Sequence, residues 1–236
     1  MKAVVLLIFS SVAFGQGIPF PGGGLVHAVG SNPIALVDHI TLIAAGGPST
    51  AINSSGASLL IAACSTIGTT SPTVSDSKSN TWVTGPPTQY SNAATYTVQL
   101  YYATSVTVGT GHTFSLTGGS ANFCSFSAWS NTKTTAPFDT ENGATNNQLT
   151  LQPGSITPAA DNALIISIAT EHQDNTTAPT VDSGMTILDS SPNAGNLPTA
   201  VAYKIQTTAT AINPTWTSGD GVFPVYAATV ADFKAP

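Results

Sequence analysis

Hydrophobic and polar residues alternate along much of this 236-residue chain, a pattern typical of β-strands rather than helices. Residues 96–102 (YTVQLYY) carry apolar side chains at the even positions, and residues 112–117 (HTFSLT) alternate in the same way. Every second residue from 124 to 128 is apolar, so Cys, Phe and Ala share one face of a predicted strand. Clusters of Gly, Pro, Asn, Asp and Ser separate these runs. The pattern predicts an all-β domain.

Two segments are almost continuously apolar. Residues 59–63 and 164–168 are expected to be central strands, buried on both faces or in the core of a sandwich. Residues 158–169 could also be read as a helix. Their β-branched Ile165, Ile166 and Ile168 favour a strand instead.

The strongest internal feature is a repeat. Four segments recur in the same order with offsets of 101 to 107 residues: 58–63 with 163–168, 72–77 with 179–183, the strand around Tyr102 with the strand around Tyr203, and 112–114 with 214–216. The sequence therefore predicts two pseudo-repeats, residues 58–130 and 163–233.

Two architectures fit this repeat: one antiparallel two-sheet sandwich of jelly-roll type over residues 36–236, or two tandem Ig-like sandwiches. The joint, 132–158, is polar and turn-rich with a strand-like stretch at 148–152, and it does not resemble a flexible linker. Residues 36–45 and 49–53 are predicted strands without a clear counterpart before the second repeat. We expect the single sandwich, a size within the normal range for one all-β domain.

The first residues, MKAVVLLIFSSVAFG (1–15), have the pattern of a secretory signal peptide, with a cleavage site expected after Gly15. Residues 16–35 would then form an N-terminal arm. Export permits a disulfide, and Cys64 and Cys124 are the only cysteines. They form either one bridge or two buried thiols, and we favour the bridge between Cys64 and Cys124. The order Cys64, Trp82, Cys124 resembles that of an immunoglobulin domain, but Asn122 stands where the tyrosine corner would be.

The charge balance excludes several partners. The chain has five Lys, no Arg and 11 acidic residues, so the net charge without the leader is 4 − 11 = −7. Such a chain has no basic patch for phosphate groups, which argues against nucleic-acid binding and against attraction to an anionic membrane. No segment after the leader reaches the length of an apolar membrane span.

Several longer strings carry a resemblance to a known family: SDSKSNTW (75–82), VGTGHTF (108–114), PFDTENGAT (137–145), LQPGSITP (151–158) and AYKIQTTATAINPTW (202–216). They are similar to strings in a family of uncharacterised secreted proteins from bacterial, environmental and phage-associated sequences. The similarity runs from about residue 40 onward. It implies an exported β-sandwich and provides no catalytic residues.

The residues themselves give no catalytic motif. A G-x-S-x-G nucleophile elbow is absent, and His27, His39, His112 and His172 are scattered without metal-binding spacing. Asp139 and Glu141 are expected to be solvated acids in a loop rather than a glycosidase pair. Residues 171–174 (EHQD) are either a connecting loop or part of a site. No catalytic residue, cofactor or metal is therefore predicted.

Calcium is the alternative that the sequence leaves open. Five aspartates are expected in loops, where carboxylates and carbonyls could meet: Asp76, Asp174, Asp182, Asp189 and Asp220. No D-x-D-x-D-G run accompanies them. Asp76 and Asp182 are explained equally well as turn formers.

Trp82, Tyr90 and Tyr101 are the candidate ligand-binding residues, because exposed aromatic rings can bind sugars. The main hypothesis is an extracellular, non-catalytic binding or adhesion module that recognises a glycan or a surface protein. The alternatives are a structural surface protein that self-assembles into a coat, filament or appendage, and a secreted carbohydrate-active hydrolase or lyase.

Overall fold

A computed structural model describes residues 32–43, 47–83, 88–92, 95–172, 174, 176–192 and 197–236, with only the backbone at 120–122. The predicted signal peptide (1–15) and almost all of the predicted arm (16–35) lie outside these residues. The described residues form strands and no helices. Among them, no helix has the length and apolarity needed to cross a membrane.

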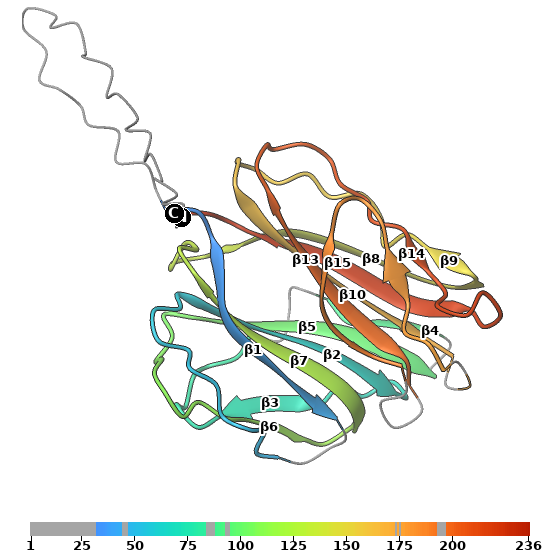
Figure 1. The fold of residues 1–236 in the computed structure, drawn as a ribbon, viewed down its shortest axis with the longest axis horizontal. Helices are drawn as coiled ribbons and strands as arrows, with labels where there is room; N and C mark the ends of the chain where they lie inside the picture. The colour runs from blue at the N-terminus through green and yellow to red at the C-terminus, as the bar shows by residue number, and fades with distance from the viewer. Residues whose placement is uncertain are drawn as a thin grey trace, which may run out of the picture. The chain divides into compact units, whose positions relative to one another are not determined.

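The strands fall into two sets that follow one another along the chain (Figure 1). The first set is β1 (Ala35–Ile43), β2 (Leu59–Ile67), β3 (Thr73–Asp76), β4 (Tyr90–Asn92), β5 (Tyr96–Thr104), β6 (Phe114–Thr117) and β7 (Ser120–Ser130). The second set is β8 (Phe138–Gln148), β9 (Thr150–Leu151), β10 (Ala163–Glu171), β11 (Thr180–Val181), β12 (Thr186–Ser191), β13 (Thr199–Gln206), β14 (Trp216–Thr217) and β15 (Val225–Phe233). We call these sets the first copy and the second copy.

Each copy builds one five-stranded antiparallel sheet, and the two sheets have the same strand order. The first copy gives β1-β7-β2-β5-β4, and the second gives β8-β15-β10-β13-β12. The pairing registers match residue by residue: Ile61 pairs with Tyr102 in the first copy, and Ile166 pairs with Tyr203 in the second. The structure thus confirms the antiparallel sandwich built from two repeats.

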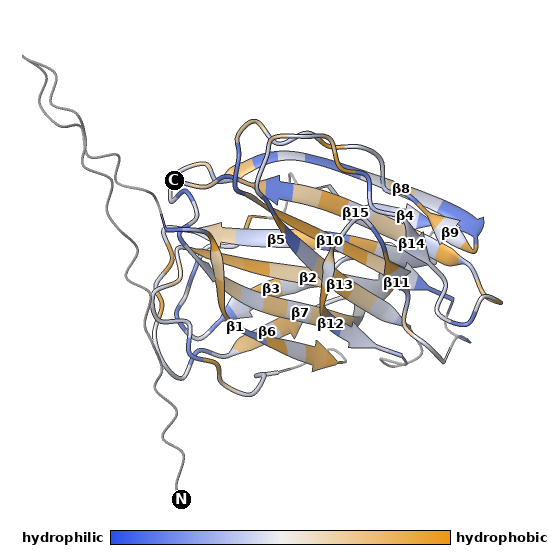
Figure 2. Ribbon diagram, turned by 45° about the horizontal axis from the view of Figure 1, so that its top comes forward, coloured by the Kyte–Doolittle hydropathy of each residue, from blue (hydrophilic) through white to orange (hydrophobic). Residues whose placement is uncertain are grey.

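Two sequence predictions need correction. The strands predicted at 36–45 and 49–53 were expected to lack a counterpart, but β8 occupies in the second sheet the edge position that β1 occupies in the first. Residues 49–53 form no strand, and Ile52 makes only an isolated bridge with His112. Residues 139 and 141 were expected in a loop, but both lie in β8, which pairs with β15 over most of its length. The polar sequence of β8, visible in Figure 2, hides this strand because one face of an edge strand can stay in contact with water.

The largest core lies between the two sheets. Alternate residues of the central strands point into it, among them Leu59 and Ile61 from β2 and Leu164 and Ile166 from β10. The remaining residues of these strands face outward but are buried as well, because a small sheet covers each outer face. β3 and β6 cover the first sheet, and β9, β14 and β11 cover the second. Burial on both faces explains the continuous apolar runs.

The predicted disulfide is present. Cys64 on β2 and Cys124 on β7 are direct cross-strand partners with their Cα atoms 4.1 Å apart, and their sulfur atoms are bonded. The bond lies in the outer core of the first copy, beneath β6. Both cysteines are fully buried.

Candidate ligand-binding site

The three aromatic residues expected to bind ligand lie at separate places. Tyr101 is only 2% exposed, and its hydroxyl donates to Pro72 O at 2.7 Å. Trp82 packs edge-on against Phe114 and donates from Nε1 to Asp76 Oδ2 at 2.7 Å. Tyr90 is half-buried in the core between the sheets. The three therefore do not form one exposed aromatic face.

The structure instead brings other residues together at one end of the sandwich. A cavity of about 220 Å³ is lined by Asn92, Thr95, Tyr96, Asn147, His172 and Tyr226. Tyr96 begins β5, Tyr226 lies near the start of β15, and His172 directly follows β10. Both copies thus contribute to the cavity, which no single segment of the sequence predicts.

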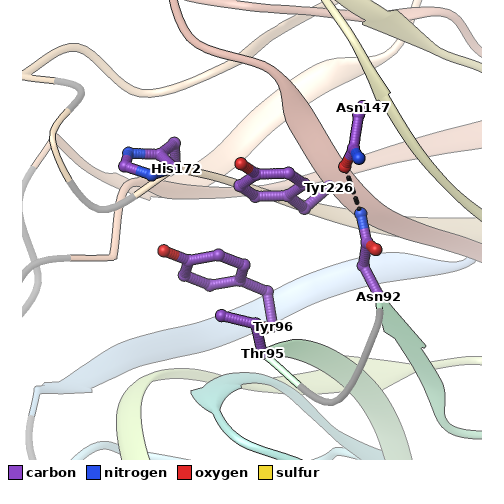
Figure 3. A pocket seen from close by; sticks show the side chains of 6 residues that line it. All are labelled: Asn92, Thr95, Tyr96, Asn147, His172 and Tyr226. Carbon is purple, nitrogen blue, oxygen red and sulfur yellow. Dashed lines mark hydrogen bonds between the residues drawn. The ribbon is translucent and has the colours of Figure 1, made fainter.

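Two tyrosine rings form the aromatic part of the cavity. Tyr96 and Tyr226 are stacked in parallel, with ring centroids 4.6 Å apart and an interplanar angle of 6°. Figure 3 shows that their hydroxyl groups point in the same direction, toward the side of His172. The His172 ring lies tilted 5.7 Å from Tyr226 and stacks on Phe223 at 5.1 Å. Contacts on several sides hold these rings in defined orientations.

Amide side chains form the polar part. Asn92 Nδ2 donates to Asn147 Oδ1 at 2.9 Å and to Asn146 O at 2.5 Å, which ties β4 to β8 across the sandwich (Figure 3). A tight turn, in which Thr95 N donates to Asn92 O at 2.8 Å, places Asn92 beside Tyr96. Neutral amides can both donate and accept hydrogen bonds. The lining combines this capacity with flat apolar rings.

The pseudo-symmetry of the sheets shows what is special about this end. The register places Leu197 where the other copy has Tyr96, and Ile67 where the other copy has His172. Leu197 is fully buried. Because the same backbone positions accept apolar residues, the fold itself does not require the tyrosine and histidine of the cavity.

A serine, a histidine and an aspartate also meet, in the outer core of the first copy. His112 Nδ1 lies 2.8 Å from Ser54 Oγ, and His112 Nε2 lies 3.3 Å from Asp76 Oδ1 without hydrogen-bond geometry. Burial lowers the pKa of His112, although the Asp76 carboxylate acts in the opposite direction. Ser54 and His112 are completely buried, so no substrate can reach them. We interpret this group as a structural link between loops.

The aspartates considered for calcium serve local structure. Asp76 Oδ1 accepts from the backbone N–H of Lys78, and Asp182 Oδ1 accepts from that of Thr215. Asp189 lies in β12 rather than in a loop, and its Oδ1 is 3.0 Å from His39 Nδ1. Within the described residues, no group of three or more His, Cys, Asp or Glu side chains is placed to bind a metal ion.

Of the cavity residues, only His172 was singled out from the sequence, within the polar group 171–174. Its neighbour Glu171 is buried, and Glu171 Oε1 accepts from Gly219 N at 2.8 Å. Tyr96 and Tyr226 were missed because each lies at or near the start of a strand, and its partner across the cavity comes from the other copy. The repeat offered one signal in the sequence: at both positions a tyrosine in one copy corresponds to a non-aromatic residue in the other copy.

Comparison with protein-family models, with curated proteins and with solved structures gave no match. The family resemblance of the sequence strings therefore stays a prediction.

Proposed function

We propose that this protein is an extracellular, non-catalytic binding module that recognises a glycan in the cavity between β4, β5, β8 and β15. The observation that carries the proposal is the half-buried ring of Tyr226, stacked on the buried ring of Tyr96 (4% exposed), beside the amides of Asn92 and Asn147. A sugar ring has an apolar C–H face and a rim of hydroxyl groups. An aromatic ring can pack against the C–H face, and amides that donate and accept hydrogen bonds can bind the hydroxyl groups.

The size of the cavity supports a small ligand unit. At about 220 Å³ it lies below the range of about 300–1,000 Å³ that encloses drug-sized ligands, and it suits one terminal monosaccharide of a longer chain. The ordered ring stack also favours binding, because little side-chain freedom remains to be lost when a ligand arrives.

The test is a glycan array with the purified protein, followed by calorimetric titration of any hit. The informative variant is Tyr226→Ala, which removes the half-buried ring of the stack. We expect its affinity to fall at least about tenfold, because aromatic anchors contribute most to such contacts. Tyr226→Phe keeps the ring and should lose less.

The matched control is Gln152→Ala, which removes an exposed amide outside the cavity whose Nε2 donates to Thr215 Oγ1 at 3.0 Å. This variant should bind like the unchanged protein. A protein that binds no glycan on the array, or a hit that Tyr226→Ala leaves unaffected, would contradict the proposal. Light scattering on the same samples tests the self-assembly alternative. Almost all of the predicted arm lies outside the described residues.

A further inference from the structure

Three ionisable side chains meet where the end of β15 lies beside the start of β8. Lys234 Nζ is 3.0 Å from Asp139 Oδ1 and donates to Phe138 O at 3.2 Å. The backbone fixes this arrangement, since Lys234 N donates to Pro137 O at 2.8 Å. Asp232, two residues before Lys234 and near the end of β15, completes the group. A lysine amine and a carboxyl group are therefore held in contact.

Asp232 is the unusual member of the group. It is 0% exposed, its Oδ1 accepts from Thr140 N at 2.9 Å, and its Oδ2 has no conventional donor. Burial, with a further contribution from the charge of Asp139, raises the pKa of Asp232 to about 7. A proton on Asp232 gives its Oδ2 a hydrogen-bond partner, because the carboxylic acid can then donate to the Asp139 carboxylate.

Asp139 and Lys234 form the charged pair. Partial burial would by itself raise the pKa of Asp139, but the Ala159 N–H and Lys234 hold this pKa below its usual range. Asp139 Oδ2 accepts from Ala159 N at 2.7 Å. At the acid side of neutrality the group thus contains an ammonium, a carboxylate and a carboxylic acid, with no net charge.

The fold does not need this group. The pairing of Ile165 with Asp232 in the second copy corresponds to that of Leu60 with Ala128 in the first. An alanine therefore fills the equivalent position, and Ser130 stands where Lys234 would be. Burying a carboxyl group costs free energy that an alanine avoids. A buried acid with a perturbed pKa next to a charged pair is a candidate for chemistry.

We propose that this cluster is a self-modification site, in which Lys234 and Asp139 condense to an intramolecular amide with Asp232 as the acid–base catalyst. The cross-link would join edge strand β8 to the residue that directly follows β15. The second copy contains no cysteine. The amide would give it a covalent link between neighbouring strands, as the disulfide does in the first copy.

The reaction starts from the ion pair. A proton passes from Nζ of Lys234 to Asp139, which leaves a neutral amine and a carboxylic acid. The amine attacks Cγ of Asp139 while Asp232 protonates the carbonyl oxygen, and Asp232 then takes a proton from the nitrogen. Asp232 protonates one hydroxyl group, which leaves as water, and the remaining hydroxyl returns its proton to Asp232. One C–N bond forms, one C–O bond breaks, and no oxidant or cofactor is consumed.

Proximity lowers the barrier to condensation. Amide formation between free groups is unfavourable in water, but well-oriented intramolecular partners can reach effective molarities of about 10⁵–10⁸ M. The 3.0 Å contact places the reacting groups next to each other. The burial of Asp232 keeps its proton away from bulk water, while the 28% exposure of the Lys234 side chain gives the released water a way out.

Intact-mass spectrometry tests the proposal. The unchanged protein is measured directly after purification and after prolonged incubation at neutral pH, beside Lys234→Arg, which keeps the cation but cannot form this amide. We expect the unchanged protein to be lighter than calculated by one water, and Lys234→Arg to have its calculated mass. A digest should yield one peptide pair joined between residues 139 and 234.

Two further variants separate the catalyst from the fold. The Asp232→Asn variant should retain its full calculated mass, or lose the mass of one water far more slowly. Asp161→Asn changes an exposed aspartate of the same copy, and this variant should condense normally. An unchanged protein that keeps its full mass after incubation overturns the proposal. Loss of one water from Lys234→Arg as well would also overturn it, and full condensation in Asp232→Asn would remove the catalyst from the scheme.

Discussion

The two copies build the same sheet but fill their outer cores in different ways. In the first copy, the pair Cys64 and Cys124 connects β2 and β7. In the second, the register places Ala169 and Ala228 at the same two positions of β10 and β15. The comparison teaches that the sheet does not depend on a bridge at this point. The volume of the missing sulfur atoms must be filled by something else.

A larger ring on the covering sheet provides that volume. Trp216 on β14 packs against Ala169 and Ala228, where the first copy has Phe114 on β6 near the disulfide. Trp216 is completely buried, and its Nε1 donates to Ser167 Oγ at 2.9 Å. The second copy thus combines small strand residues with a large covering residue. The first copy combines a disulfide with a smaller ring.

The largest effect is expected for Trp216→Ala. The change leaves a cavity above two alanines and removes the donor to Ser167, so stability should fall by about 4 kcal/mol. Chemical denaturation measures the loss. Phe114→Ala in the first copy is the matched comparison and should cost about 3 kcal/mol, since a smaller ring is removed. Equal losses would argue against different packing solutions in the two copies.

The second effect concerns the disulfide. Replacing both cysteines in Cys64→Ala/Cys124→Ala should lower stability by about 3 kcal/mol, because the bridge closes a 60-residue loop and its removal frees the unfolded chain. The denaturation midpoint measures this change. Reduction of the unchanged protein is the control and should shift the midpoint in the same direction. If neither treatment shifts it, packing alone stabilises both copies.

An effect of opposite sign is expected at Asp232, where the first copy has Ala128. Below pH 3.8 both folded and unfolded chains carry the proton; from there to about pH 7 only the unfolded chain ionises, so stability falls as pH rises. Asp232→Asn removes this penalty and should add about 4 kcal/mol at pH 7, because the pKa shift is about three units at about 1.4 kcal/mol each, and nothing near pH 3.

This comparison is best made in the Lys234→Arg background, in which no amide between residues 139 and 234 can form. Denaturation of that variant with and without Asp232→Asn, at several pH values, isolates the carboxyl group. A stability difference that does not change between pH 3 and pH 7 would show that the pKa of Asp232 is the same in the folded and the unfolded chain.

The smallest effect is expected where side chains of the two copies form hydrogen bonds with each other. Ser125 Oγ on β7 donates to Asp189 Oδ2 on β12 at 2.5 Å, and Asp189 also contacts His39 on β1. Ser125→Ala should cost about 1.5 kcal/mol, because a hydrogen bond to a carboxylate contributes more than one between neutral groups. Thermal melting measures the loss. The control is Ser130→Ala, which removes a weaker bond to Ala35 O at 3.3 Å and should stay within about 0.5 kcal/mol of the unchanged protein.

Much of the fold could be predicted from local patterns. The runs at 59–63 and 164–168 indicated central strands, and both are buried on two faces. The strand β8 was missed because its residues are polar and its partner, β15, is almost 90 residues away. Tyr90 illustrates the same limit, since its ring packs where only the glycine at 143 leaves room on β8.

The sequence by itself determined the all-β class, the twofold repetition and the availability of one disulfide, because alternation, turn residues and cysteine number are local or countable properties. Only the tertiary structure decided that Tyr96 stacks on Tyr226 and that Lys234 contacts Asp139. Each of these contacts joins residues about 95 or more positions apart in the chain. Sheet order and register bring such residues together, and a one-dimensional pattern of hydrophobic and polar residues does not contain that information.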